Sequence, residues 1–169
     1  EPVLLNAGIG INTGPCAVGN MGSRQRFAYS TLGDAVNLAA RFEGQTKAYG
    51  INILIGEETY KQIQDFAVIE ADLIKVKGKT KPVRMYILLG DDEFAVGESF
   101  VALAAKHAAM LGDYRAQKFE GAIKKAKACK ALGFDSLDVF FDLYIERAED
   151  LIENSPGNDW DGVFEALTK

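Results

Sequence analysis

The sequence predicts an α+β fold, with helices packed on a sheet over residues 1–92 and an all-helical extension over residues 93–169. Two observations lead to this fold class. Short apolar strands alternate irregularly with helical patterns in the first part, and only helical periodicity follows the polar break GDDE at residues 90–93. We therefore expect two units, and we place their boundary at that break.

Apolar spacing and turn residues predict the elements of the first part. Apolar side chains at helical spacing predict a helix over residues 34–49, and Gly50 suits its end. A shorter helix is expected over residues 57–63. The expected strands cover residues 4–13, 16–20, 26–31, 51–55, 66–76 and 83–89. The glycines at positions 8, 10, 14, 19 and 22 match no phosphate-binding fingerprint, and we interpret them as sites of turns and close packing.

Helical patterns continue through the second part. Apolar faces predict helices starting near Phe100 and near Phe119, and a third helix after Asp135 or Ser136, either of which suits an N-cap. A last short helix is expected in DWDGVFEAL, and residues 109–131 resemble one tetratricopeptide-like hairpin. Because such a unit cannot bury its own apolar face, it should pack on the first part or on a partner.

Composition narrows the classes of function. The hydrophobic share of 48% is sufficient for a packed core, and the formal net charge of −5 disfavours a nucleic-acid partner. Cys16 and Cys129 form no CxxC pair and suggest reduced, buried thiols. His107, the single histidine, lies on a predicted apolar helix face, which indicates a core histidine rather than a base or a zinc ligand. No apolar run approaches a membrane span, so we expect no membrane contact by this segment itself.

The segment FAYSTLGDAVNLAARFEG, residues 27–44, carries the most chemical information. Asn37 and Arg41 are four residues apart on a predicted helix, so they project from the same face. An amide there can orient a ribose oxygen, and a planar guanidinium offers paired donors to phosphate oxygens. By itself the pair is weak evidence, and a solvated helix face is the favoured interpretation.

Three blocks of the sequence together resemble the catalytic domain of the class III adenylyl and guanylyl cyclases. They are GIGINTGPCAVGNMGS, YSTLGDAVNLAARFE and KVKGKTKPVRMYIL, in the order that the family shows. The resemblance covers residues 1–90 and implies the C-terminal part of a ferredoxin-like cyclase sheet. The extension resembles that of bacterial cyclases with an extracellular sensor and membrane helices. It implies a cytoplasmic segment of a membrane-anchored protein. The start of the chain inside a predicted strand, without Met, suggests a piece of a longer protein.

The resemblance assigns roles to individual residues. It implies that Asn37 orients the ribose and that Arg41 stabilises charge on the α-phosphate as the 3′-hydroxyl attacks. Lys79 would hold the terminal phosphates, with Lys77 as the alternative, although a solvated hairpin turn also explains this basic cluster. Thr31 stands where the family selects the base, and its hydroxyl suits adenine. The alternative for Thr31 is a strand threonine chosen for β-propensity.

The family binds two Mg²⁺ (or Mn²⁺) ions through aspartates of the N-terminal part of the domain, which this sequence does not contain. We interpret Asp34 as a helix cap rather than a metal ligand. Family sites form between two protomers, so the resemblance implies a homodimer that converts ATP to cyclic AMP and pyrophosphate, and an isolated chain that is inactive. The alternative is a non-catalytic dimerisation or sensory module with a protein-binding helical tail. A guanylyl cyclase is disfavoured by Thr31.

Overall fold

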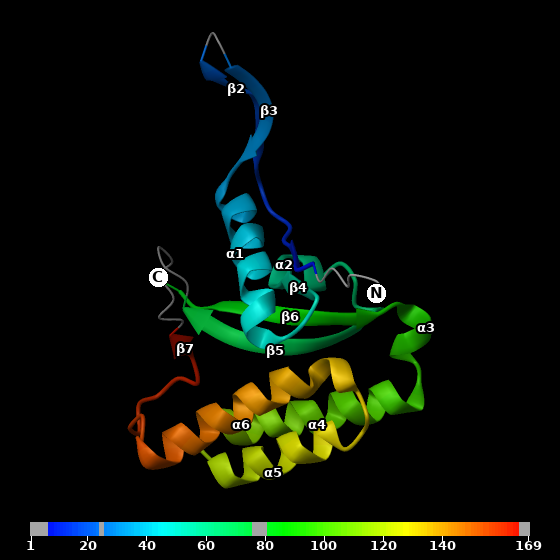
Figure 1. Ribbon diagram of the computed structural model, residues 1–169, viewed down its shortest axis with the longest axis vertical. Coiled ribbons are helices and arrows are strands. Elements are labelled where there is room, and N and C mark those ends of the chain that lie inside the picture. Colours follow the sequence, from blue (N-terminus) through cyan, green and yellow to red (C-terminus); the bar gives the residue numbers. More distant parts are fainter. Residues whose placement is uncertain (1–6, 24–25, 76–80, 166–169) are drawn as a thin grey trace, which may run out of the picture.

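The computed structural model describes residues 7–23, 26–75 and 81–165. Within them the chain forms a five-stranded sheet, a separate two-stranded hairpin, and helices on both faces of the sheet (Figure 1). The strands are β1 (Ile9–Ile11), β2 (Ala17–Ser23), β3 (Arg26–Leu32), β4 (Ile53–Gly56), β5 (Ala67–Lys75), β6 (Val83–Gly90) and β7 (Phe164–Glu165). The helices are α1 (Asp34–Tyr49), α2 (Glu57–Tyr60), α3 (Asp92–Ala95), α4 (Glu98–Arg115), α5 (Phe119–Lys130), the 3₁₀ helix η1 (Asp135–Leu137) and α6 (Asp138–Glu153).

The five-stranded sheet has the order β1-β4-β6-β5-β7. Its three central strands pair antiparallel, with Ile69 of β5 opposite Ile87 of β6, whereas β1 on β4 and β7 on β5 are parallel. Helix α1 lies on one face, and α4, α5 and α6 cover the other (Figure 1). This mixed sheet with packed helices confirms the predicted α+β class, and most predicted strands agree with the observed ones to within two or three residues.

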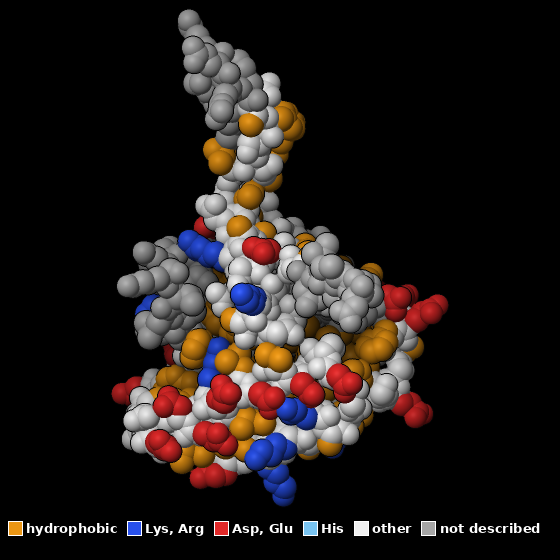
Figure 2. Space-filling model, in the orientation of Figure 1, with side chains coloured by type: hydrophobic (Ala, Val, Ile, Leu, Met, Phe, Trp, Pro, Cys, Tyr) orange, Lys and Arg blue, Asp and Glu red, His pale blue; other side chains and the backbone are white. Residues whose placement is uncertain are grey.

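The hairpin of β2 and β3 extends away from the body of the molecule (Figure 1). Its strands pair only with each other, from Ala17 opposite Leu32 onward. Val18, Tyr29 and Leu32 are exposed by 55%, 77% and 59%, and Figure 2 shows hydrophobic side chains along this hairpin. A lone two-stranded hairpin is marginally stable in water, and this one leaves three large apolar side chains exposed.

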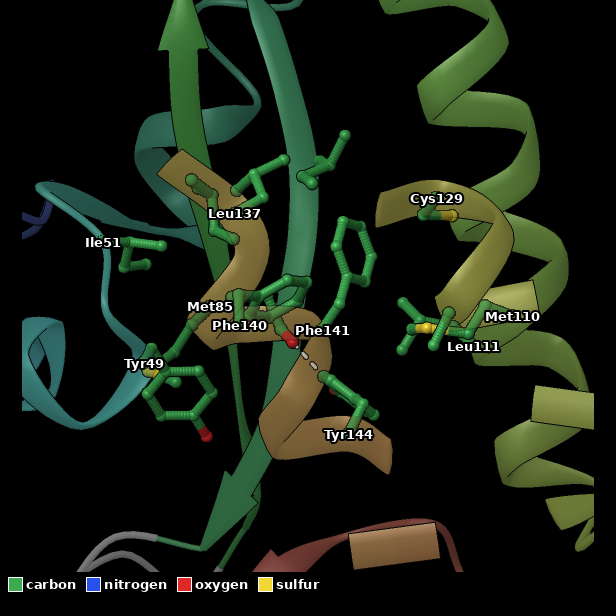
Figure 3. Close-up of a cluster of buried hydrophobic side chains, with 14 of the residues drawn as sticks. Tyr49, Ile51, Met85, Met110, Leu111, Cys129, Leu137, Phe140, Phe141 and Tyr144 are labelled. Atoms are coloured by element: carbon green, nitrogen blue, oxygen red, sulfur yellow. Dashed lines mark hydrogen bonds between the residues drawn. The ribbon is translucent and has the colours of Figure 1, made fainter. Parts of the chain in front are cut away.

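A single hydrophobic cluster joins the sheet to the helical extension. It includes Tyr49 of α1, Met85 of β6, and Phe140 and Phe141 of α6, all of them buried (Figure 3). Phe42 of α1 is also buried in this cluster. The extension thus packs on the first part of the chain, as expected of helices that cannot bury their own apolar faces. The tetratricopeptide-like character of α4 and α5 and the boundary between residues 92 and 93 stay predictions.

Three local expectations were wrong. The final segment forms strand β7 instead of a helix, because the edge of β5 at Ile74 and Lys75 offers backbone pairing. Cys16 is exposed at the base of the hairpin, and only Cys129 is buried. Asp135 and Ser136 lie inside η1 and cap no helix. In the described ranges, no helix combines the length and the apolar character that crossing a bilayer requires.

Candidate functional site

Helix α1 lies directly on strand β1, and glycines make this close approach possible. A Cβ atom at Gly10 would lie 2.1 Å from the carbonyl oxygen of Ala39 and 2.4 Å from the amide nitrogen of Glu43, both in the backbone of α1. A Cβ atom at Gly8 would lie 2.0 Å from Oγ1 of Thr46. Gly8 and Gly10 therefore serve close packing, as predicted, and they set the distance between α1 and the sheet, whereas an added Cβ at Gly19 would meet no atom within 4 Å.

The ends of α1 have identifiable causes. Gly33 occupies the N-cap, and the amide of Asn37 donates to its carbonyl at 3.1 Å. Gly50 ends the helix in the left-handed conformation, with φ of 64°, which glycine adopts without steric cost. The predicted bounds of this helix are confirmed. Asp34 does not occupy the cap position; it lies in the first turn, where a carboxylate favours the helix dipole.

Asn37 and Arg41 lie on a flank of α1 that points away from the core. Phe42, Thr46 and Tyr49 form the buried face of the helix, whereas Asn37 is exposed and Arg41 is half-buried. Residues four apart differ by about 40° around a helix axis, so the amide and the guanidinium project from neighbouring positions. Neither side chain hydrogen-bonds or pairs with another of the described residues. Both remain available to a ligand, and their catalytic roles stay predictions.

The other predicted ligand contacts lie at the two ends of this region. Thr31 is exposed on β3 and stands opposite Val18 of β2, three positions before α1 begins. Its contact with an adenine base stays a prediction. Lys77 and Lys79 lie outside the described residues, in the connection between the antiparallel strands β5 and β6. Their predicted phosphate contacts are not tested.

The described part of the chain does not offer a donor set for Mg²⁺. It contains no group of three or more His, Cys, Asp or Glu side chains that could hold a metal ion. Mg²⁺ prefers several oxygen ligands, with one or two of them carboxylates beside substrate phosphates. Residues 7–23, 26–75 and 81–165 thus supply no cluster of three such side chains.

His107 is a core histidine, as predicted. It is 2% exposed, and its Nε2 lies 2.6 Å from the backbone carbonyl oxygen of Glu70. Burial lowers the pKa of His107 to about 4, so the ring is neutral near neutral pH and its Nε2–H donates to that carbonyl. His107 thus links α4 to β5 through this hydrogen bond.

A buried polar cluster escaped prediction from the sequence. Tyr49 of α1, Asp72 of β5 and Arg147 of α6 meet at the lower end of α1. Burial, and then the Asp72 carboxylate, raises the pKa of Tyr49 far above its usual range, so its hydroxyl stays protonated and donates to Asp72. Burial alone would lower the pKa of Arg147, but Tyr49 and Asp72 outweigh it and raise the pKa. No sequence signal separates Asp72 or Arg147 from the other charged residues of their segments, AVIEADLIK and DVFFDLYIERAEDLIE.

Comparison with known proteins identifies the family of this chain. Residues 3–90 match the family described as the Adenylate and Guanylate cyclase catalytic domain, and the chain belongs to this family. The resemblance inferred from the three sequence blocks is thereby confirmed.

Among curated proteins, the chain is 40% identical over 86 residues to an adenylate cyclase of Anabaena cylindrica, an alignment that covers 48% of this chain and 17% of that protein. It is 42% identical over 91 residues to an adenylate cyclase of Mycobacterium tuberculosis, covering 53% of this chain and 19% of that protein. The chain thus spans less than a fifth of either relative. Among solved structures, the adenylyl cyclase CyaB of P. aeruginosa is 36% identical, with a TM-score of 0.40 over 45% of this chain and 38% of that one.

Proposed function

We propose that this chain is the part of an adenylate cyclase that stabilises the transition state as ATP is converted to cyclic AMP and pyrophosphate. The observation that carries the proposal is the available Asn37 and Arg41 pair on the flank of α1, in a chain of this family. Adenylate cyclases among the similar proteins support ATP as the substrate. Thr31, whose hydroxyl both donates and accepts, supports adenine over guanine.

In this mechanism the 3′-oxygen of ATP attacks the α-phosphorus in line with the leaving pyrophosphate. The new O–P bond forms as the bond to the β-phosphate oxygen breaks, and the 3′-hydroxyl proton passes to solvent. Arg41 donates hydrogen bonds to the α-phosphate oxygens, on which charge builds, and Asn37 holds a ribose oxygen. Lys79, or alternatively Lys77, neutralises the departing pyrophosphate. Divalent-metal ligands would come from the N-terminal half of the catalytic domain, and the chain alone is expected to be inactive.

We also infer that the working form is a homodimer. The β2–β3 hairpin extends from the body and exposes Val18, Tyr29 and Leu32, which supports a contact with a second protomer (Figure 2). In such a dimer one protomer supplies Asn37 and Arg41, and its partner supplies the metal ligands. The parent protein is proposed to be membrane-anchored, with this segment in the cytoplasm.

The test is the turnover of an Arg41→Ala variant of the complete protein that carries this chain. Loss of a transition-state donor costs about 2–4 kcal/mol of barrier, so kcat for cyclic AMP formation should fall roughly 30- to 1,000-fold. Lys47→Ala is the matched control, because Lys47 is an exposed cation on the same helix. Unchanged turnover in Arg41→Ala would remove Arg41 from the mechanism. A complete protein that dimerises without forming cyclic AMP would support the alternative, a non-catalytic module.

A further inference from the structure

Three side chains from distant parts of the sequence form what we call the Tyr49–Asp72–Arg147 cluster. The Tyr49 hydroxyl donates to Oδ2 of Asp72 at 2.6 Å, and Nη1 of Arg147 donates to the same oxygen at 2.6 Å. Nη2 of Arg147 donates to the Tyr49 hydroxyl at 3.3 Å. The other carboxylate oxygen of Asp72 accepts from the amide of Leu73 at 2.7 Å. The cluster therefore closes a triangle of hydrogen bonds between α1, β5 and α6.

The cluster is almost sealed from water. The side chains of Asp72 and Arg147 are 2% and 10% exposed, and Tyr49 is 1% exposed. The Arg147 guanidinium lies 3.4 Å from the ring centroid of Phe164, in β7 at the end of the described chain. A buried charge is tolerated only when it is paired and hydrogen-bonded. Nη1 and Nη2 of Arg147 meet this condition through Asp72 and Tyr49, whereas its Nε is buried without a partner.

A β-bulge in β5 aims Asp72 into this cluster. Glu70 stands opposite Tyr86 and Asp72 stands opposite Met85, so Ala71 is an extra residue in the strand. The bulge makes Ala71 and Asp72 successive buried residues, and the Ala71 carbonyl accepts from the Tyr144 hydroxyl of α6 at 2.8 Å. Helix α6 is thus bound to the bulge by two polar side chains, Tyr144 and Arg147.

The same helix contacts the end of α1. Tyr49 and Phe140 stack with ring centroids 6.3 Å apart, and both belong to the buried cluster of Figure 3. A Cβ atom at Gly50 would lie 2.4 Å from Cβ of Val139, so the chain leaving α1 touches the start of α6. Packing and hydrogen bonds together hold the last turn of α1 against α6.

We propose that Arg147 is a positioning residue for the cyclase reaction, and this inference rests on the function proposed above. By joining Tyr49 to Asp72, Arg147 fixes the lower end of the helix that presents Asn37 and Arg41. At 1.5 Å per residue, Arg41 lies about 12 Å and Asn37 about 18 Å along the axis from Tyr49. A tilt of about 5° at the Tyr49 end therefore moves Asn37 by roughly 1.5 Å, and a misplacement of about 1 Å can cost 100-fold in rate.

The experiment must separate positioning from stability, because breaking a buried ion pair also destabilises a protein. Replacing both charges by apolar residues of similar size often leaves stability unchanged, so the double variant Asp72→Leu with Arg147→Met is informative. It removes the hydrogen bond that the Tyr49 hydroxyl donates to Asp72, the one that it accepts from Arg147 and the one from the Leu73 amide to Asp72, but it keeps the core filled. Lys130→Met is the matched control, because Lys130 forms an ion pair with Asp142 on the surface of the same helical extension.

Turnover and thermal unfolding would be measured on the complete protein carrying each change, with Arg41→Ala as the reference. In the double variant we expect kcat to fall about 10- to 100-fold and KM for ATP to change less than about threefold. The unfolding temperature should stay near that of the wild type. Tyr49→Phe should lower kcat in the same direction, and Lys130→Met should leave it unchanged. Arg147→Lys should restore part of the kcat lost in Arg147→Met, since it keeps the charge but not the planar fork.

Wild-type kcat in a double variant that unfolds like wild type would overturn the positioning role. So would a loss of activity in Arg147→Met that merely equals its loss of folded protein. If Arg41→Ala abolishes turnover while these variants do not change it, the positioning role alone fails. If Arg41→Ala has no effect, the proposed function fails first.

Discussion

Gly10→Ala tests whether the close contact between β1 and α1 sets the position of the helix. The added Cβ would lie 2.1 Å and 2.4 Å from backbone atoms of Ala39 and Glu43, in the middle of a hydrogen-bonded helix. Side-chain rotation cannot relieve a clash with backbone. Because Cβ contacts below 3.0 Å are essentially never seen, α1 must move away from β1 by about 1 Å.

The expected cost follows from two opposing effects. Overpacking of a well-packed contact costs about 1–3 kcal/mol. Replacing glycine by alanine restricts the unfolded chain and returns about 0.4–1 kcal/mol. We therefore expect Gly10→Ala to lower the free energy of unfolding by about 1–2 kcal/mol.

Gly19→Ala in β2 is the matched control, because no atom lies within 4 Å of its added Cβ. It should be neutral or stabilising by up to about 1 kcal/mol. Urea unfolding of the 169-residue chain, followed by circular dichroism, measures both. In the complete protein, Gly10→Ala should also lower kcat, since α1 carries Asn37 and Arg41. Equal urea midpoints for the two variants would refute the inference that these glycines set the helix position.

Three further predictions follow. Burial lowers the pKa of His107 from 6.5 to about 4, so between these pH values the unfolded chain binds a proton that the folded chain does not. The contribution of His107 to the free energy of unfolding is therefore full above about pH 6.5, and it falls by roughly 2 kcal/mol from about pH 7 to about pH 5. Urea unfolding at both values should show this slope in the wild type and not in His107→Gln, and an equal slope in both would exclude His107 as its source. A thiol reagent should modify the exposed Cys16 in the native chain but reach Cys129 only in denaturant, because Cys129 is buried and burial raises its pKa to about 11. Labelling of Cys129 in the native chain would contradict its burial. Tyr29→Ser should weaken self-association in sedimentation velocity without shifting unfolding, and unchanged association would exclude the hairpin as the dimer contact.

Local signals were sufficient for the elements that build the candidate site. The bounds of α1 followed from apolar spacing and from Gly50, and the structure reproduces them. The sequence predicts turns or close packing at the glycines of the first part, and Gly8 and Gly10 lie against α1. These features depend on contacts within a few residues or on the absence of a side chain, so they can be predicted from the sequence. The family assignment also came from contiguous blocks, and residues 3–90 match it.

Other features depend on contacts between distant residues. The final segment has a helical pattern, but it pairs with β5, whose edge lies about ninety positions earlier in the chain. Cys16 looks like a buried thiol in sequence, yet it lies at the base of a hairpin that extends from the body. The burial of a side chain depends on how the whole chain packs, so it cannot be predicted from the residue type alone.

The sequence alone determined the helix that presents Asn37 and Arg41, the strands beneath it and membership in the cyclase family, because spacing and motif are local properties. Only the tertiary structure decided that the helical extension shares a core with the sheet and that Arg147 reaches Asp72, 75 positions away. The physical reason is desolvation. The sequence suggests that Asp72 and Arg147 are solvated, but folding removes the water around them and a buried charge must be paired, so they form an ion pair.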